Sequence, residues 1–397
     1  MIRSLATFLT LGIATALPSQ PIMARDDGAG CAAPPQARKL IIGTPFQILT
    51  ANFDGSKFSI TGNHTAEGTA PSWMVYKDPS LLWAVNENAN DIDLFTLDSS
   101  KSNPTPKSTA QGSAGVVFLE FNKDKSRMVG AAYGSGKIDV WDVDSVSGEL
   151  KLHKTITVPG NPNPAQGAHH PHQALLDPTG RFFVIPNLGG DTVLVLDGES
   201  DKWEITGNVT LPTGTGPRHG GFLTAGDKHY YALASELSNQ LFLFELSYPG
   251  DTIAFKQLQA QSTYGTTPPA NASSAAAGEL VVAANQRDVY VSNRVSGNET
   301  DSIAHFAFAA DHTTLDYQAT ISSGGLRPRM FSLSADKEQS LAFVANQGGE
   351  SGLVAFKRSL DTGKLDPTPV ASMPSQALVA PQLAATDLMG PQFVLEI

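Results

Sequence analysis

Cysteine, long apolar runs and positive charge are all scarce in this chain of 397 residues. The single cysteine, Cys31, excludes an intrachain disulfide, so it either lies in a frayed leader or pairs with another molecule. Lysine and arginine number 27 against 38 acidic residues, and the net charge of −11 disfavours nucleic acid and anionic membranes as partners. Beyond the N-terminal region, no segment is long and apolar enough for a membrane helix, so no membrane span is expected.

Helical periodicity is also hard to find, whereas an apolar repeat recurs every 43 to 57 residues. Each unit has Pro-x-His or Pro-Arg, a short apolar run, a turn, and a second apolar run that ends in a polar corner. Strict apolar/polar alternation after most corners predicts strands. The corners lie at seven places: Gly43-Thr44, Asn86, Tyr133, Asn187, Glu236, Asn293 and Asn346.

Seven such units predict an all-β fold, a seven-bladed β-propeller with four-stranded blades, in a single domain over residues 38–397. The first unit lacks its leading strand, and residues 390–395 have the pattern of an unpaired one. We therefore expect the C-terminal strand to pair within the N-terminal blade and close the ring, since an open ring exposes a sheet edge. Residues 105–115 and 261–278 are rich in Ser, Thr, Ala and Pro, which predicts mobile spacers.

The N-terminus has the pattern of an export signal. Arg3 precedes a short apolar stretch at residues 5–17, and small residues allow cleavage after Ala16 or Ala24. Residues 1–24 are thus a predicted signal peptide with a short leader, and the chain is expected to be secreted. Four sequons favour a eukaryotic glycoprotein, with glycosylation expected at Asn63, Asn208, Asn271 and Asn298.

Several motifs stand in a fixed order along the repeat: residues 170–173, 176–181, 216–219, 235–237, 291–294 and 344–347. With them the chain resembles the seven-bladed propeller lactonase family, which includes fungal 3-carboxy-cis,cis-muconate cyclase and propeller-type 6-phosphogluconolactonases. The resemblance covers residues 39–397. It implies a site of one His, one Glu and two Arg at the mouth of the channel. Matched motif by motif, these fall on His172, Glu236, Arg218 and Arg294, and His219 follows Arg218 directly.

The repeat independently favours convergence of these residues. His172 and Arg218 occupy the same position in neighbouring units, and Glu236 and Arg294 lie at or just after the polar corner. Two guanidiniums suit the carboxylates of a small acid, and His172 or Glu236 suits general acid/base chemistry, so His172 and Glu236 are the predicted catalytic pair. Arg218, Arg294 and His219 are the predicted substrate-binding residues. No cofactor and no metal are required.

Other interpretations stay open for the same residues. Arg329 is the repeat equivalent of Arg218, so an Arg after Pro is also explained as a structural habit of the blade. His172 stands beside His169 and His170, which suggests a metal site, but no matched carboxylate set is evident. A salt bridge explains Arg294 equally well. The Asn corners at Asn187, Asn293 and Asn346 are expected to bind backbone rather than substrate.

Two function classes follow from these residues. The first is an exported enzyme that forms or hydrolyses a lactone of a small carboxylic acid, either a carboxymuconate cyclase or a lactonase. The second is a non-catalytic secreted or cell-wall propeller that serves as a binding or adhesive module, because fold alone does not determine function. A calcium-dependent gluconolactonase on a six-bladed ring is disfavoured, because the corners supply mostly Asn and the units number seven.

Overall fold

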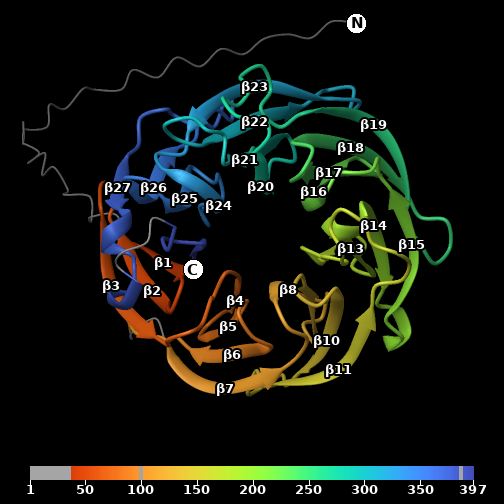
Figure 1. Cartoon of the computed structure of the whole chain (residues 1–397), viewed down its shortest axis with the longest axis horizontal. Helices are drawn as coiled ribbons and strands as arrows, with labels where there is room; N and C mark the ends of the chain where they lie inside the picture. The colour runs from red at the N-terminus through yellow and green to blue at the C-terminus, as the bar shows by residue number, and fades with distance from the viewer. Residues whose placement is uncertain (1–36, 98–101, 384–387) are drawn as a thin grey trace, which may run out of the picture. The chain divides into compact units, whose positions relative to one another are not determined.

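Seven four-stranded antiparallel sheets stand in a ring (Figure 1). The computed structural model describes residues 37–97, 102–383 and 388–397, and Gln36–Ile397 form one unit. Cys31 and the predicted signal segment lie outside the described residues. The ring confirms the predicted seven-bladed propeller. In the described part of the chain, helix is limited to four 3₁₀ turns, Leu188–Gly190, Glu199–Asp201, Ser375–Ala377 and Pro381–Leu383, and no helix there has the length and apolarity to cross a membrane.

The blades are numbered in chain order, and each is given from its innermost to its outermost strand. Blade 1 contains β28 (Phe393–Glu396), β1 (Arg38–Thr44), β2 (Gln47–Phe53) and β3 (Phe58–Thr65); blade 2 contains β4 (Met74–Lys77), β5 (Leu81–Val85), β6 (Asp91–Thr96) and β7 (Thr105–Gln111). Blade 3 contains β8 (Val116–Phe121), β9 (Arg127–Ala132), β10 (Lys137–Val143) and β11 (Leu150–Thr157); blade 4 contains β12 (Leu175–Leu176), β13 (Phe182–Asn187), β14 (Thr192–Asp197) and β15 (Glu204–Thr210). Blade 5 contains β16 (Pro217–Ala225), β17 (Lys228–Ser235), β18 (Gln240–Ser247) and β19 (Ala254–Ser262); blade 6 contains β20 (Ala276–Val282), β21 (Asp288–Arg294), β22 (Ser302–Phe308) and β23 (Leu315–Ser322). Blade 7 contains β24 (Leu326–Leu333), β25 (Leu341–Gly348), β26 (Ser351–Lys357) and β27 (Ala371–Pro374).

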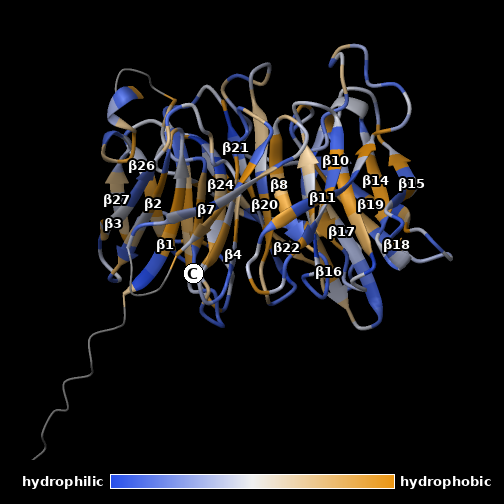
Figure 2. Cartoon of the chain, turned by 90° about the horizontal axis from the view of Figure 1, so that it is seen from below, coloured by the Kyte–Doolittle hydropathy of each residue, from blue (hydrophilic) through white to orange (hydrophobic). Residues whose placement is uncertain are grey.

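Burial differs between the strands of a blade in the way that the sequence pattern requires. The second strands are almost wholly buried, and every residue of β13 is buried because both its faces pack against neighbouring blades. The outermost strands β7 and β15 alternate between exposed and partly buried residues. In Figure 2 the apolar colour accordingly concentrates on strands, and the connecting loops are largely hydrophilic. The expectation of a mobile spacer over residues 105–115 is wrong for Thr105–Gln111, which form β7: an edge strand facing solvent is polar enough to resemble a loop.

The C-terminal strand closes the ring, as predicted. β28 pairs antiparallel with β1, from Leu40 opposite Glu396 to Gly43 opposite Phe393. Charges reinforce the joint, because Arg38 NH1 lies 3.0 Å from Glu396 Oε1 and 3.1 Å from Asp336 Oδ2 of blade 7. The first and last strands of the domain therefore pair in one sheet, blade 1, and an ion pair links that sheet to blade 7.

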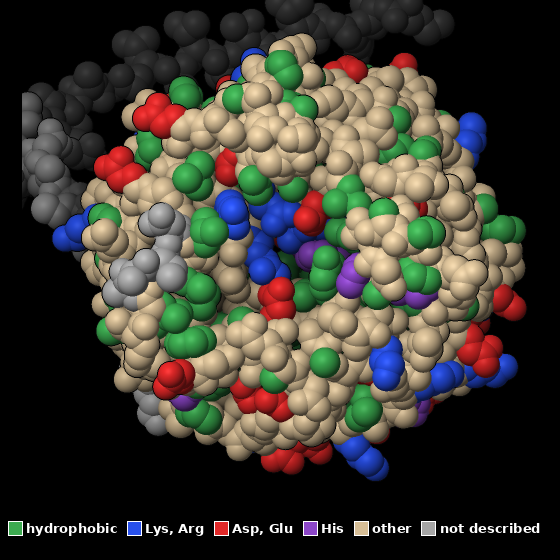
Figure 3. All heavy atoms as spheres, in the orientation of Figure 1, with side chains coloured by type: hydrophobic (Ala, Val, Ile, Leu, Met, Phe, Trp, Pro, Cys, Tyr) green, Lys and Arg blue, Asp and Glu red, His purple; other side chains and the backbone are tan. Residues whose placement is uncertain are grey.

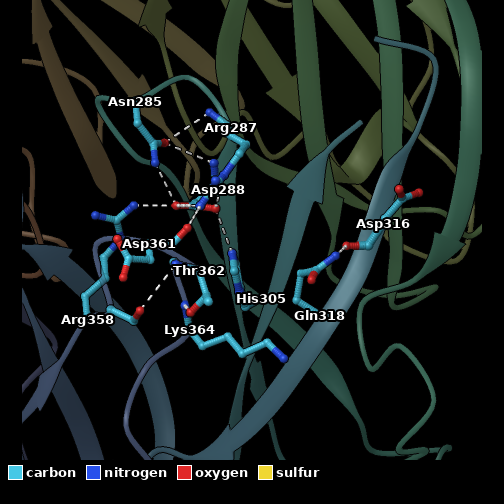
Figure 4. Close-up of polar contacts among 12 residues, drawn as sticks. Asn285, Arg287, Asp288, His305, Asp316, Gln318, Arg358, Asp361, Thr362 and Lys364 are labelled. Carbon is cyan, nitrogen blue, oxygen red and sulfur yellow. Dashed lines mark hydrogen bonds and ion pairs between the residues drawn. The ribbon is translucent and has the colours of Figure 1, made fainter. Parts of the chain in front are cut away.

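A buried ionic cluster joins blades 6 and 7 at the start of β21, the opposite end of that strand from Arg294 (Figure 4). Asp288 is fully buried and accepts hydrogen bonds from Arg358 NH2, from His305 Nε2 at 3.1 Å and from Asn285 Nδ2 at 2.8 Å. Arg358 Nε also donates to Tyr290 Oη at 2.7 Å. Gly363 lies over the carboxylate with φ +74°, where an added Cβ would overlap the side chain of Asp288. The close approach explains the glycine.

Candidate active site at the mouth of the channel

One stretch of each innermost strand, or of the residues just before it, lines a cavity in the channel. Blades 1 to 4 contribute Gln392, Ser72 with Trp73, Val117 and His172, and blades 5 to 7 contribute Arg218 with His219, Glu279, and Arg329 with Met330. The charged residues of this lining are Arg218, Glu279 and Arg329. Figure 3 shows basic, acidic and histidine side chains gathered in the hollow at the centre of the ring. The ring therefore brings residues that are far apart in sequence to one place.

β-Bulges in the innermost strands aim several of these side chains inward. The register between β16 and β17 shifts between Pro217 and His219, which leaves Arg218 without a ladder partner. The same shift in β24 leaves Arg329 unpaired, and a wider one in β20 leaves Gly278 and Glu279 unpaired. A bulge turns the extra residue out of the normal alternation. Arg218, Glu279 and Arg329 thereby face the channel.

The polar corners fix the loops at this end of the ring, with one exception. Asn187 accepts from the backbone N–H of His170 at 2.9 Å, Asn293 Nδ2 donates to the carbonyl of Thr263 at 3.0 Å, and Asn346 Nδ2 donates to that of Ser323 at 2.9 Å. These contacts confirm that the Asn corners bind backbone. In blade 5 the corresponding ladder position, opposite Pro217, belongs to Ser235, so the corner predicted at Glu236 is one residue late. Glu236 directly follows that corner, and its carboxylate contacts guanidiniums.

The structure brings Arg218, Glu236 and Arg294 into direct contact. Arg218 Nε lies 2.8 Å and Arg294 NH2 2.9 Å from the same oxygen, Glu236 Oε2. The side chain of Arg218 is only 2% exposed, that of Arg294 13% and that of Glu236 25%. Arg218 NH1 and Arg294 Nε are buried and have no hydrogen-bond partner among the described residues. Two buried guanidiniums thus share one carboxylate and keep donors to spare.

The charges at this point alter one another's pKa values. Burial alone would raise the pKa of Glu236, but Arg294 and Arg218 outweigh it and hold that pKa below its ordinary range, so Glu236 is ionised at neutral pH. Burial, together with the positive charge of Arg294, lowers the pKa of Arg218. An anion bound at this site would relieve the crowding of positive charge.

His172 lies in the same cavity and contacts His219 rather than the arginine pair. His172 Nδ1 lies 3.0 Å from His219 Nε2, and His219 Nδ1 lies 2.7 Å from Glu279 Oε1. All three side chains are buried, and His172 retains 6% exposure. Burial and the neighbouring Arg218 hold the pKa of His172 well below 6.5, so its ring is neutral at pH 7. His172 is therefore available to accept a proton.

The neighbouring histidines do not join His172 in a common donor set. His169 Nδ1 contacts Asn187 Nδ2 at 3.0 Å, and His170 Nδ1 contacts the backbone carbonyl of Tyr133 at 2.8 Å. The ring of Tyr133 stacks on His170 at 4.2 Å and meets His172 edge-on at 5.5 Å. The three rings have three separate partners, so His169 and His170 surround His172 without sharing a contact with it.

A second ion pair lies across the mouth and was not expected from the sequence. Arg329 NH2 lies 2.6 Å from Glu87 Oε2, which joins blade 7 to blade 2 over the channel. Arg329 contributes positive charge that lowers the pKa values of His172 and Glu236. Interpreting Arg329 only as a structural feature of the repeat does not account for its ion pair with Glu87.

Sequence reasoning also missed Glu279 and Glu87. Glu279 lies in the two-residue bulge of β20, where the one-residue bulges of β16 and β24 carry Arg218 and Arg329. Glu87 directly follows the Asn86 corner, as Glu236 follows Ser235 and Arg294 follows Asn293. A charged residue directly after a corner was therefore the available signal for Glu87.

Similarity to known proteins agrees with the fold. Residues 39–380 match the family described as lactonase, 7-bladed beta-propeller. A probable 6-phosphogluconolactonase of Arthroderma benhamiae is 30% identical over 336 residues, which cover 81% of this chain and 82% of that protein. The structure of a periplasmic gluconolactonase of Pseudomonas aeruginosa has a TM-score of 0.75 at 22% identity, covering 91% of this chain and 99% of that one.

A putative 6-phosphogluconolactonase of Bacteroides fragilis shares the fold as well, with a TM-score of 0.72 at 19% identity over 92% of this chain and 99% of that one. The structural likenesses are below 25% identity and carry the fold alone. The family match spans most of the chain and confirms the resemblance noted from its motifs. The chain belongs to the seven-bladed β-propeller lactonase family.

Proposed function

We propose that this protein hydrolyses the lactone of a small acid at the mouth of its channel. The observation that carries the proposal is the pair of buried guanidiniums, Arg218 and Arg294, which share Glu236 and keep unpartnered donors. Buried donors without partners cost free energy unless a ligand satisfies them. A lactone carbonyl that becomes an oxyanion is a ligand of the required charge.

The proposed reaction uses His172 as the general base. Its neutral ring takes a proton from water, the water oxygen bonds to the lactone carbonyl carbon, and the oxyanion is held by guanidinium donors of Arg218 and Arg294. The bond from that carbon to the ring oxygen then breaks, and the proton on His172 passes to the ring oxygen. The product is an open-chain hydroxy acid, whose carboxyl group ionises at neutral pH.

Glu236 has a different role in this scheme. Because the guanidiniums hold its pKa low, Glu236 is a carboxylate in the free protein and holds Arg218 and Arg294 in position. Glu236 becomes protonated during substrate binding only if the substrate displaces the two guanidiniums. The acid/base work of the two predicted catalytic residues therefore falls mainly on His172.

The substrate class we propose is a sugar-acid lactone. Support comes from the relative named a probable 6-phosphogluconolactonase, which is 30% identical to this chain. Formation of a lactone from carboxymuconate is the alternative reaction at the same groups, with a proton delivered to carbon while an internal carboxylate adds to a double bond.

We also propose that the protein is exported and glycosylated. The predicted signal at residues 1–24 supports export. Each sequon asparagine is exposed on the folded domain, at Asn63, Asn208, Asn271 and Asn298, which supports access by the glycosylation machinery. Mass spectrometry of the secreted protein before and after removal of N-glycans tests this. Unmodified peptides at all four positions would overturn the glycoprotein proposal.

Proton release from gluconolactone and 6-phosphogluconolactone, followed with a pH indicator, tests the function. We expect the wild type to exceed spontaneous hydrolysis and Glu236→Gln to lose most of that excess. Arg127→Gln, in a surface ion pair with Asp142 and Asp201, is the matched control and keeps activity. Carboxymuconate is assayed in parallel to detect cyclisation.

A wild type that turns over none of these compounds would contradict the enzymatic proposal. Melting temperatures measured with gluconate and with inorganic phosphate then decide between the remaining interpretations. A rise with either anion would indicate a binding module that uses the same arginines. An unchanged melting temperature with both anions would contradict the proposed anion site.

A further inference from the structure

Three buried side chains that line the cavity form a continuous hydrogen-bonded chain. Glu279 Oε1 lies 2.7 Å from His219 Nδ1, and His219 Nε2 lies 3.0 Å from His172 Nδ1. His219 is 2% exposed, and its edge packs against Trp73 and Phe118 with ring centroids at 5.7 and 5.8 Å. Both nitrogens of His219 are thus occupied by protein groups, so this ring is not a direct ligand for substrate.

The bulge in β20 places Glu279 beneath the histidines. Gly278 and Glu279 have no ladder partners there, and the backbone N–H of Glu279 donates instead to Ser292 Oγ at 2.8 Å. Glu279 Oε1 also accepts from the backbone N–H of Leu280 at 3.1 Å. Two donors therefore converge on one carboxylate oxygen, which fixes its orientation toward His219.

The order of the contacts determines where the protons lie. A carboxylate only accepts, so His219 Nδ1 carries a proton and donates it to Glu279. The neutral His219 ring then has a lone pair on Nε2, and the hydrogen on the bond to His172 must belong to His172 Nδ1. His172 Nε2 is left with its lone pair, and it has no hydrogen-bond partner among the residues described.

The surroundings favour this arrangement over a charged one. Burial is the largest cause that lowers the pKa values of both His172 and His219, and the charge of Arg218 acts in the same direction on each. The negative charge of Glu279 in turn raises the pKa of Arg218 against the effect of burial. A carboxylate at Glu279 is therefore balanced by a nearby guanidinium, and the two rings stay neutral.

We propose that Glu279 and His219 are positioning residues that hold His172 in its Nδ1–H tautomer and leave Nε2 as the base that faces the channel. The proposal rests on the proposed hydrolytic function for its catalytic meaning, although the tautomer itself does not depend on any substrate. The logic is that of a carboxylate that orients a catalytic histidine, extended here by one additional ring.

Two-bond ¹H–¹⁵N spectra of the protein labelled with ¹⁵N-histidine test the tautomers directly. His172→Gln and His219→Gln assign the two rings among the nine histidines of the chain. We expect both rings to be neutral at pH 7 with the proton on Nδ1. A proton on Nε2 of His172, or rapid exchange between its tautomers, would overturn the proposal whether or not the protein hydrolyses a lactone.

Glu279→Gln is the functional test, with Glu149→Gln on the exposed surface as its matched control. We expect kcat for the lactone to fall at least about tenfold, since an orienting partner of this kind typically contributes that much. KM should change by less than about twofold, because Arg218 and Arg294, which would contact the lactone carbonyl, are unchanged in this variant. The melting temperature should still rise with gluconate.

Three outcomes of this test are distinguishable. Wild-type kcat in Glu279→Gln together with an unchanged His172 spectrum overturns the positioning role. Loss of the gluconate effect indicates a collapsed site, and His219→Gln, which keeps Glu279 buried, is then used to remove the link instead. If the wild type itself shows no turnover, the proposed function fails, and the tautomers alone decide this inference.

Discussion

At the scale of single residues, a charged side chain directly after the polar corner distinguishes blade 5 from blade 4. Asn187 of blade 4 is followed by Leu188, whereas Ser235, at the same ladder position in blade 5, is followed by Glu236. Glu236 contacts two guanidiniums. The carboxylate of Glu236 is negatively charged, whereas an amide at the same position would be neutral. It therefore permits two buried arginines in one place, and each of them keeps a donor for a ligand.

Arg218→Lys is expected to behave as a severe substitution. An ammonium cannot contact Glu236 and an oxyanion through one planar fork, and it is more strongly hydrated than a guanidinium. We expect kcat for the lactone to fall by about 100-fold, the effect of losing one oxyanion donor. Steady-state kinetics measure this, with Arg127→Lys as the surface control. A lysine variant within about threefold of the wild type would contradict a bidentate role.

The acid limb of the pH–rate profile reports the state of His172. The base works only when unprotonated, and its pKa is well below 6.5, so kcat/KM should stay level as pH falls through 6.5 and decline only at lower pH. The ionisable groups that act on His172 are Arg218, His219, Arg329 and Arg294, with Tyr133 edge-on and Glu279 behind His219.

Removing one of the positive charges near His172 should shift the acid limb of the pH–rate profile to higher pH. Arg329→Gln takes away a positive charge that lowers the pKa of His172, so the decline should begin at a higher pH than in the wild type. Arg181→Gln, which removes a guanidinium paired with Asp197 and Asp251, should leave the limb in place. An unshifted limb in Arg329→Gln would show that another group titrates.

At the scale of elements, the length of the repeat could be predicted from the sequence, whereas the residues of the inner strands that face the channel could not. The corners predicted all seven second strands, because burial on both faces gives those strands a continuous apolar sequence. The bulges in β16, β20 and β24 each shift the alternation, so the inward position of Glu279 does not follow from counting along the strand. The strand β7 was mistaken for a spacer because its exposed residues are polar.

The junction between blades 6 and 7 depends on its buried ionic cluster. Asp288→Asn removes the charge that compensates buried Arg358, so we expect the free energy of unfolding to fall by about 3–5 kcal/mol. Chemical denaturation followed by tryptophan fluorescence measures this. Asp316→Asn, an exposed aspartate nearby in Figure 4, is the control and should change stability by less than about 0.5 kcal/mol.

The contribution of Asp288 also has a defined pH dependence. Burial opposes its ionisation, but hydrogen bonds from His305, Arg287 and Asn285 outweigh burial and hold its pKa below the ordinary 3.8. A depressed carboxyl pKa stabilises the fold above the unfolded value and loses that effect as pH falls through the folded value. The gap between wild type and Asp288→Asn should therefore be constant above pH 3.8 and shrink below it.

At the scale of the whole molecule, ring closure was predictable because an unpaired leading strand and an incomplete first unit stood at opposite ends of the sequence. The contact of Arg329 with Glu87 was not predictable in the same way. It crosses the channel between blades that are not neighbours along the chain, and no local pattern records which side chains face each other across a ring. The symmetry of the ring predicted that the site residues lie at one end of it. Which of their side chains contact each other could be learned only from the structure.

Closure is testable through the apolar face of its strand. Phe393 is 1% exposed and packs edge-on against Trp73 at 5.4 Å, so Phe393→Ala should cost about 3–5 kcal/mol. Leu360→Ala, at a residue that is 53% exposed, is the control. Deleting residues 393–397 should also expose the edge of β1 and cause self-association, measured by light scattering. A monomeric deletion variant of unchanged stability would refute closure by this strand.

The bulges of the innermost strands have a consequence for how new specificities arise on this scaffold. Each one presents a side chain to the channel without placing it in the hydrogen-bonded ladder, so its identity is not constrained by strand pairing. Val117, Arg218 and Arg329, which differ in size and charge, already occupy the same kind of position. Exchanging such residues between blades alters what the lumen recognises while every sheet keeps its register, which makes these the natural sites for redesign.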